Sequence, residues 1–206
     1  MIKNILFDMG GVIFTQNTEE AFRRFRNEGI DTSYYMGIYG QKDFFMELEA
    51  GKIDASEFCR RMSAVVGHEV SWQRAQYCWL GYFDGVPGQR LRNLELLRQH
   101  HHLYLLSNTN PFMMDFTRSS RFSQSGRPIT SFFDQLFLSY EMKVCKPDKE
   151  IYLKALAAGR MKASECLFVD DSRKNTDAAA ALGFHVLTVP TNHEWMNRVT
   201  ELLETE

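Results

Sequence analysis

Residues 5–13 read ILFDMGGVI. The apolar run from Ile5 to Phe7 has the length and composition of a buried strand, and it ends at a carboxylate, Asp8. Gly10 and Gly11 follow closely, and a glycine pair indicates a sharp backbone turn or a close approach to a ligand. Because open parallel sheets bind their ligands beyond the carboxyl ends of the strands, Asp8 stands where a ligand site is expected.

Further apolar runs of strand length follow along the chain, at residues 103–106, 136–138, 166–169 and 185–189. Helical patterns with recognisable ends lie among them, at residues 86–100, 149–158 and 173–182. Short strands that alternate with helices are typical of a parallel sheet with right-handed crossovers. We therefore predict an α/β fold, in which a Rossmann-like parallel sheet carries helices on both faces.

The stretch from Thr18 to Tyr82 interrupts this alternation. Its apolar residues have helical spacing, and no convincing strand occurs in it. Asp54 and Glu57 have the spacing of a capping box that opens a helix at Ala55. The sequence therefore predicts a small helical insert after the first strand.

This insert divides the chain into two predicted units. Residues 16–85 form the helical unit, and residues 1–15 together with 86–206 form the sheet-bearing core. A surface loop or a frayed helix end is predicted for residues 118–131, which contain five serines, one glycine and one proline. Four aromatic residues of the insert either fill a small core of its own, which is the favoured role, or face a ligand: Trp72, Tyr77, Trp79 and Tyr82.

Composition excludes several classes of protein. A chain of 206 residues with 44% hydrophobic and 24% charged positions is typical of a globular protein that needs no disulfide or structural metal. The formal net charge of −2 provides no basic face for nucleic acid or for an anionic membrane. No segment has the length of a bilayer span or of a secretory leader, and the four scattered cysteines predict reduced thiols in the cytoplasm.

Polar residues follow the ends of the predicted strands. Each has an ordinary role when taken singly, either as a helix cap or as a surface lysine. Together they would form a site for a doubly charged oxyanion and a hard cation, and oxygen ligands of this kind suit magnesium. The residues concerned are Asp8, Ser107, Asn108, Lys146, Asp170 and Asp171.

Four segments that contain these residues resemble the motifs of the haloacid dehalogenase-like hydrolases, most of which are magnesium-dependent phosphatases. ILFDMGGVI is similar to the first motif and LLSNT, at residues 105–109, to the second. Lys146-Pro147-Asp148 matches the third and FVDDS, at residues 168–172, the fourth. The helical insert stands where this family commonly carries its cap domain, and the chain looks like the capped sugar-phosphate phosphatases, such as glucose-1-phosphate phosphatases.

The resemblance implies a role for each polar residue that contacts the phosphate. Asp8 would be the nucleophile that forms an aspartyl-phosphate, which water then hydrolyses. Ser107 and Asn108 would donate hydrogen bonds to the phosphoryl oxygens. Lys146 would neutralise both the phosphate and the carboxylate of Asp8, so that it serves in catalysis and in substrate binding.

The resemblance also implies a magnesium site, with one departure from the family pattern. The implied ligands are Asp8, Asp170, Asp171 and the backbone carbonyl of Gly10. Family phosphatases usually have an aspartate where this chain has Gly10, and its side chain protonates the leaving oxygen and then activates water. Glycine can supply the carbonyl but not the acid, and loss of a general acid costs about 10²- to 10⁴-fold in rate.

Three residues of the insert are candidates for the missing acid, although a solvated surface position is the favoured interpretation of each: Asp43, Glu47 and His68. The expected function is that of a cytoplasmic magnesium-dependent phosphatase acting on a small phosphorylated metabolite, such as a sugar phosphate. The alternatives are a metal-independent 2-haloacid dehalogenase and a non-catalytic protein that binds a phosphorylated metabolite. A phosphoacceptor receiver module has the wrong order of motifs and no helical insert.

Overall fold

The computed structural model describes residues 1–37 and 40–205. Its main sheet is parallel and has the strand order β5-β4-β1-β6-β7. The strands are β1 (Asn4–Phe7), β4 (His102–Ser107), β5 (Gln135–Leu138), β6 (Cys166–Asp170) and β7 (His185–Thr188). The order places β1 at the centre, and the predicted α/β fold with a parallel sheet is confirmed.

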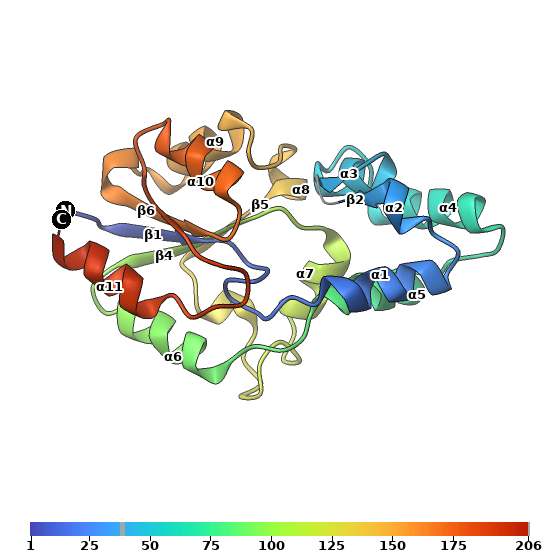
Figure 1. The fold of residues 1–206 in the computed structure, drawn as a ribbon, viewed down its shortest axis with the longest axis horizontal. Helices are drawn as coiled ribbons and strands as arrows, with labels where there is room; N and C mark the ends of the chain where they lie inside the picture. The colour runs from blue at the N-terminus through green and yellow to red at the C-terminus, as the bar shows by residue number, and fades with distance from the viewer. Residues whose placement is uncertain (38–39, 206) are drawn as a thin grey trace.

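Alternate residues of the strands supply two hydrophobic cores, one on each face of the sheet. Ile5 and Phe7 belong to one core, whereas Leu6 belongs to the other. Helices cover both faces (Figure 1). The helices α6 (Gly88–Leu97) and α11 (Met196–Thr205) lie on the side of Ile5, and α9 (Lys149–Gly159) and α10 (Arg173–Ala180) lie on the side of Leu6.

Between β1 and β4 the chain forms a group of helices at one end of the molecule, to the right of the sheet in Figure 1. We call residues 16–85 the helical insert; these boundaries remain a prediction. Its helices are α1 (Thr18–Asn27), α2 (Thr32–Tyr35), α3 (Phe44–Glu49), α4 (Ala55–Val66) and α5 (Trp72–Trp79), followed by the turn η1 (Leu80–Tyr82). Asp54 caps α4 as predicted, since its carboxylate accepts a 2.8 Å hydrogen bond from the amide of Glu57.

An aromatic cluster holds the insert together. Trp79 is buried against Phe25, Phe45 and Phe58, with ring centroids 5.4 to 5.9 Å apart. Tyr77, in contrast, is exposed and lies beneath the guanidinium group of Arg24. The core role favoured for the aromatic residues therefore applies to Trp79 and not to Tyr77.

One local prediction was wrong, and a second was correct only in part. The insert contains two short antiparallel strands, β2 (Met36–Gly37) and β3 (Gly40–Gln41), which are too short to show a period-2 pattern. The segment 118–131 consists mainly of turns and bends and is largely exposed, as predicted for a surface loop, but Phe122 and Ile129 are buried and anchor it in the core. Ile129 begins the turn η2 (Ile129–Ser131). Serine and glycine around Phe122 mask this anchor in the sequence.

The insert contacts the core through α5 and through the loop after α3, among other places. The helix α5 lies against α7 (Pro111–Thr117), where the rings of Trp72 and Phe112 have centroids 4.5 Å apart. Near α8 (Ser139–Met142), the ammonium of Lys143 donates a 2.8 Å hydrogen bond to the carbonyl of Gly51. Gly51 has a φ of +61°, and a Cβ atom there would lie 2.0 Å from the carbonyl oxygen of Tyr140, so only glycine permits this approach.

No helix in the described part of the chain is both long and apolar enough to cross a lipid bilayer.

Candidate active site

The ammonium group of Lys146 is the centre of the candidate site. It donates hydrogen bonds to Oδ1 of Asp8 at 2.7 Å, to Oδ2 of Asp170 at 2.6 Å and to the carbonyl of Leu106 at 2.9 Å. The side chain of Lys146 is 1% exposed, and that of Asp170 is fully buried. Three strand ends, those of β1, β4 and β6, therefore meet at one buried cation, as predicted for a parallel sheet.

Asp170 is held in place by the turn that opens α10. Its Oδ1 accepts a 2.7 Å hydrogen bond from the amide of Ser172. The side-chain amide of Asn175 donates to both carboxylate oxygens at 3.1 Å. Asn175 was not predicted as a site residue, although its position five residues after Asp170, in the first turn of the following helix, places it over the strand end.

Asp171 completes a cluster of three carboxylates. Oxygen atoms of Asp8, Asp170 and Asp171 all lie within 4.8 Å of one another. Asp171 also accepts a 2.6 Å hydrogen bond from the hydroxyl of Thr191, a second residue that the sequence did not reveal. The geometry thus brings together the three acids that the sequence nominated as metal ligands.

The cluster carries more negative than positive charge. Burial raises the pKa of Asp8 to about 7; Lys146 opposes this shift, while the charges of Asp170 and Asp171 add to it. Burial also raises the pKa of Asp171, with a further contribution from Asp170. Burial alone would lower the pKa of Lys146, but the adjacent carboxylates outweigh it and raise that pKa, so the lysine stays protonated.

Three carboxylates and one ammonium leave a formal charge of 1 − 3, or −2, if all four groups are ionised. A divalent cation would balance this charge, and carboxylate oxygens are the donors that a hard cation prefers. The chemistry of the donor set therefore fits magnesium.

The turn after β1 brings the backbone against this cluster. Gly11 has a φ of +74°, and a Cβ atom there would lie 2.7 Å from Oδ2 of Asp171 and from Cγ2 of Thr191. The sharp turn predicted from the glycine pair is therefore required by close packing. Gly10 lies beside the pocket, and a Cβ atom on it would meet Oε1 of Gln16 at 2.6 Å.

Ser107 and Asn108 reach the pocket from the end of β4. The side chain of Asn108 is committed to the backbone of Lys146: its amide donates to the carbonyl at 2.9 Å, and its oxygen accepts from the N–H at 2.7 Å. This pair of hydrogen bonds fastens the lysine segment to β4. The hydroxyl of Ser107 contacts the carbonyl of Asn108 at 3.3 Å.

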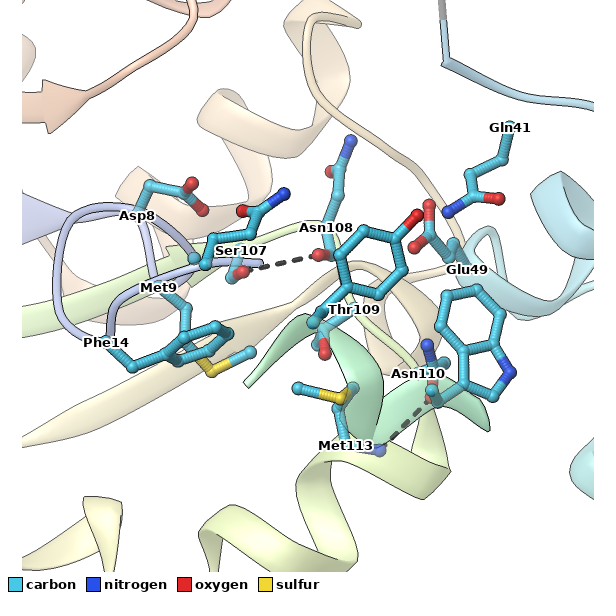
Figure 2. A pocket seen from close by; sticks show the side chains of 14 residues that line it. Asp8, Met9, Phe14, Gln41, Glu49, Ser107, Asn108, Thr109, Asn110 and Met113 are labelled. Atoms are coloured by element: carbon cyan, nitrogen blue, oxygen red, sulfur yellow. Dashed lines mark hydrogen bonds between the residues drawn. The ribbon is translucent and has the colours of Figure 1, made fainter. Parts of the chain in front are cut away.

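The pocket above these strand ends has a volume of about 180 Å³ (Figure 2). The sheet contributes Asp8 and Ser107 to its lining, and the insert contributes the opposite wall. The residues of that wall are Gln41, Glu49, Trp79 and Tyr82. Trp79 and Tyr82 therefore also line the pocket, which agrees with the alternative prediction that aromatic residues of the insert face a ligand.

The three candidate acids of the insert do not line this pocket. Glu47 forms a 2.8 Å ion pair with Arg61, and Asp43 is exposed. His68 is exposed and borders a separate surface hollow. Glu49, two residues after Glu47, does line the pocket, and the sequence analysis did not nominate it.

Fold and site together define a protein with a parallel α/β core, an acidic pocket at the carboxyl edge of the sheet and a helical insert over that edge. Residues 2–183 match the family model of the haloacid dehalogenase-like hydrolases. The chain belongs to this family, as the motifs predicted, and it is therefore a hydrolase.

Three relatives illustrate the similarity. The chain is 37% identical to D-ribitol-5-phosphate phosphatase of Bacteroides thetaiotaomicron over 204 residues, which cover 98% of this chain and 99% of the relative. A HAD-like family hydrolase from Porphyromonas gingivalis has a TM-score of 0.94 and 36% identity, with both chains fully covered. A HAD family enzyme from B. thetaiotaomicron, solved in complex with magnesium and inorganic phosphate, has a TM-score of 0.90 and 28% identity over 97% of this chain and 99% of that one.

Proposed function

We propose that this hydrolase is a magnesium-dependent phosphatase of small phosphorylated metabolites and that it works through an aspartyl-phosphate on Asp8. One observation carries the proposal: Lys146 joins Asp8 to Asp170 at 2.7 and 2.6 Å, with Asp171 in the same cluster. This arrangement offers a carboxylate nucleophile, a fixed positive charge and three acidic oxygens that fit a divalent cation. Similarity to a D-ribitol-5-phosphate phosphatase supports it.

The roles of the individual residues follow from their contacts. Lys146 orients the carboxylate of Asp8 through Oδ1 and offsets the negative charge of an incoming phosphate. Ser107 lines the pocket beside Asp8 and is the proposed hydrogen-bond donor to the phosphoryl oxygens. Asp8, Asp170, Asp171 and the carbonyl of Gly10 are the proposed magnesium ligands. Bound there, the metal would neutralise charge between nucleophile and phosphate.

For Asn108 we propose a role other than the direct hydrogen bond to phosphate that the family resemblance implies. Because its side chain is engaged with the backbone of Lys146, we propose that it contributes to substrate binding through placement of that lysine. Positioning of this kind matters because a loose phosphoryl-transfer transition state is stabilised mainly by geometry and charge.

The wall contributed by the insert points to a polyhydroxylated substrate. Two residues of this wall carry a buried polar atom without a hydrogen-bond partner in the described part of the chain, namely Oε1 of Gln41 and Nε1 of Trp79. Thr109, which lines the pocket from the core, carries a third such atom, its Oγ1. Buried polar atoms without partners are rare, and they are costly unless a ligand satisfies them. Hydroxyl groups of a sugar phosphate or sugar alcohol phosphate can both donate and accept hydrogen bonds there.

A phosphate-release assay tests this function. The purified chain is expected to release phosphate from D-ribitol 5-phosphate or another small sugar or polyol phosphate in the presence of magnesium, and EDTA is expected to abolish the reaction. A panel of such esters, measured as kcat/KM, ranks the substrates. Halide release from 2-haloacids in EDTA, without phosphate release, would instead establish the dehalogenase alternative.

The same panel separates catalysis from binding. A protein that only binds phosphorylated metabolites would show a raised melting temperature with sugar phosphates and no phosphate release in any metal condition. That result would contradict the proposed function.

Asn175→Ala is expected to raise the magnesium concentration needed for half-maximal activity by about 10- to 100-fold, the usual effect of removing a group that orients a metal ligand. The reason is the loss of both hydrogen bonds to Asp170. Arg173→Ala is the matched control, since this side chain lies on the same helix and is 86% exposed. An unchanged magnesium requirement in Asn175→Ala would contradict the proposed role of Asp170 as a ligand.

The cap function of residues 16–85 and the cytoplasmic location also remain proposals. The insert would act as the cap of this enzyme, because its residues form the wall of the pocket opposite Asp8.

A further inference from the structure

The site lacks an acid where the family pattern would place one. Position 10 is glycine, and the space that a side chain would enter there holds Oε1 of Gln16, 2.6 Å from an ideal Cβ atom. A carboxamide can form a hydrogen bond to a leaving oxygen but cannot protonate it. An efficient reaction with an alkoxide leaving group therefore requires a proton donor from elsewhere in the pocket.

Glu49 places a carboxyl group in the pocket lining, where it could donate a proton to the leaving oxygen. Among the described residues that line the pocket, Asp8 and Glu49 are the two that carry carboxylates. Figure 2 shows them on different sides of it, Asp8 at the strand end and Glu49 on the wall that the insert provides. A substrate whose phosphate contacts Asp8 would extend its leaving oxygen and carbon chain toward Glu49.

The backbone around Glu49 is held against the core. Glu49 is the last residue of α3, and Gly51 follows two residues later. Gly51 packs against the backbone of Tyr140 and accepts the hydrogen bond of Lys143. Glu49 is thus fixed over the pocket by a contact that tolerates no side chain at position 51, which is the rigid support that a catalytic group requires.

The surroundings of Glu49 favour a carboxyl group that can gain and lose a proton near neutral pH. Burial raises the pKa of Glu49 to about 7, the charge of Asp8 adds to the shift, and no lysine or arginine of the described chain opposes it. Burial and, to a lesser degree, the charge of Glu49 raise the pKa values of Tyr82 and Cys145, so those two groups stay neutral. A general acid works best when its pKa lies near the working pH.

We propose that Glu49 is the general acid and base of this enzyme and that it replaces the side chain missing at Gly10. The inference rests on the proposed phosphatase function. In the first step an oxygen of Asp8 forms a bond to phosphorus, the bond from phosphorus to the leaving oxygen breaks, and Glu49 gives its proton to that oxygen. In the second step water attacks phosphorus, Glu49 takes the proton from this water, and the bond between Asp8 and phosphorus breaks to release inorganic phosphate.

The test compares two leaving groups in Glu49→Gln. For D-ribitol 5-phosphate, whose alkoxide must be protonated, kcat/KM is expected to fall by about 10²- to 10⁴-fold. For p-nitrophenyl phosphate, whose nitrophenolate leaves without a proton, formation of the aspartyl-phosphate should continue, and a burst of nitrophenolate should precede slow hydrolysis. Glu47→Gln is the matched control, because Glu47 lies on the same helix, pairs with Arg61 and is outside the pocket.

A rescue variant separates proton transfer from substrate binding. In Glu49→Gln combined with Gly10→Asp, the new side chain has to displace only the flexible end of Gln16. Activity on D-ribitol 5-phosphate is expected to recover by at least about 10-fold relative to Glu49→Gln, because an acid again faces the leaving oxygen. A residue that only bound substrate hydroxyls would not be replaced by an acid at position 10.

The outcomes distinguish this inference from the proposed function. A wild-type protein that releases no phosphate from p-nitrophenyl phosphate or from any ester of the panel would contradict the function itself. Two results with an active wild type would overturn the role of Glu49 alone. In one, Glu49→Gln loses turnover equally on both esters and shows no burst of nitrophenolate from p-nitrophenyl phosphate; in the other, it loses turnover on neither ester. Failure of the Gly10→Asp rescue in a folded protein with native melting temperature would do the same.

Discussion

Asp8→Asn should reduce phosphate release by about 10⁴- to 10⁶-fold, the range found when the nucleophile or another member of a catalytic unit is removed. The reason is that an amide lacks the charged oxygen that would form the bond to phosphorus. The substitution keeps the shape of the side chain, and the amide oxygen can still accept the hydrogen bond from Lys146. Turnover of D-ribitol 5-phosphate at saturating magnesium is the measurement.

The loss in Asp8→Asn should be chemical rather than structural. Burial and the neighbouring acids raise the pKa of Asp8 from 3.8 to about 7, so ionising this group costs the folded state stability. Stability falls as pH rises between these two pKa values, because the folded state retains the proton there and the unfolded state does not, and at pH 8 the full cost is present. The variant should therefore melt at or above the wild-type temperature at pH 8 in EDTA.

The reaction with p-nitrophenyl phosphate distinguishes the role of Asp8 as nucleophile from the role of Glu49 as general acid. Asp8→Asn is expected to abolish both the burst and the turnover with p-nitrophenyl phosphate, whereas Glu49→Gln keeps the burst. A folded Asp8→Asn variant that retains a substantial fraction of wild-type activity would rule out Asp8 as the nucleophile.

The sheet was predictable because its information is local. Each strand appears as a short apolar run, and the residue at its carboxyl end marks the edge where ligands bind. Asp8 and Asp170 were found in this way, and because β1 and β6 are parallel neighbours, identifying these strands is sufficient to place the two carboxylates near one another. Lys146 was found in the Lys146-Pro147-Asp148 segment before α9, and its ammonium meets both carboxylates at hydrogen-bond distance.

The missed residues depend on contacts between distant segments. Glu49 resembles any surface glutamate in the sequence, and only the docking of Gly51 against Tyr140 places it at the pocket. Thr191 meets Asp171 from the loop after β7, across 20 positions of sequence. No local pattern encodes such contacts, because they arise only after the core has formed and the insert has packed on it.

Lys146→Met is the second change with a large expected effect, and it acts on stability as well as on activity. It removes the cation that contacts both Asp8 and the fully buried Asp170. Breaking a buried ion pair from one side typically costs about 3–5 kcal/mol, because an uncompensated charge stays in the interior. The free energy of unfolding, measured by denaturant titration at pH 7 in EDTA, should fall by that amount.

The activity of Lys146→Met should fall by about 10²- to 10³-fold, as expected when a preorganised group that stabilises the transition state is lost. Asp170→Asn in the same background separates the two effects. This second change removes the carboxylate charge that is left buried without the lysine, so it should restore part of the stability without restoring activity. Wild-type stability in Lys146→Met would show that this lysine does not balance the buried acids.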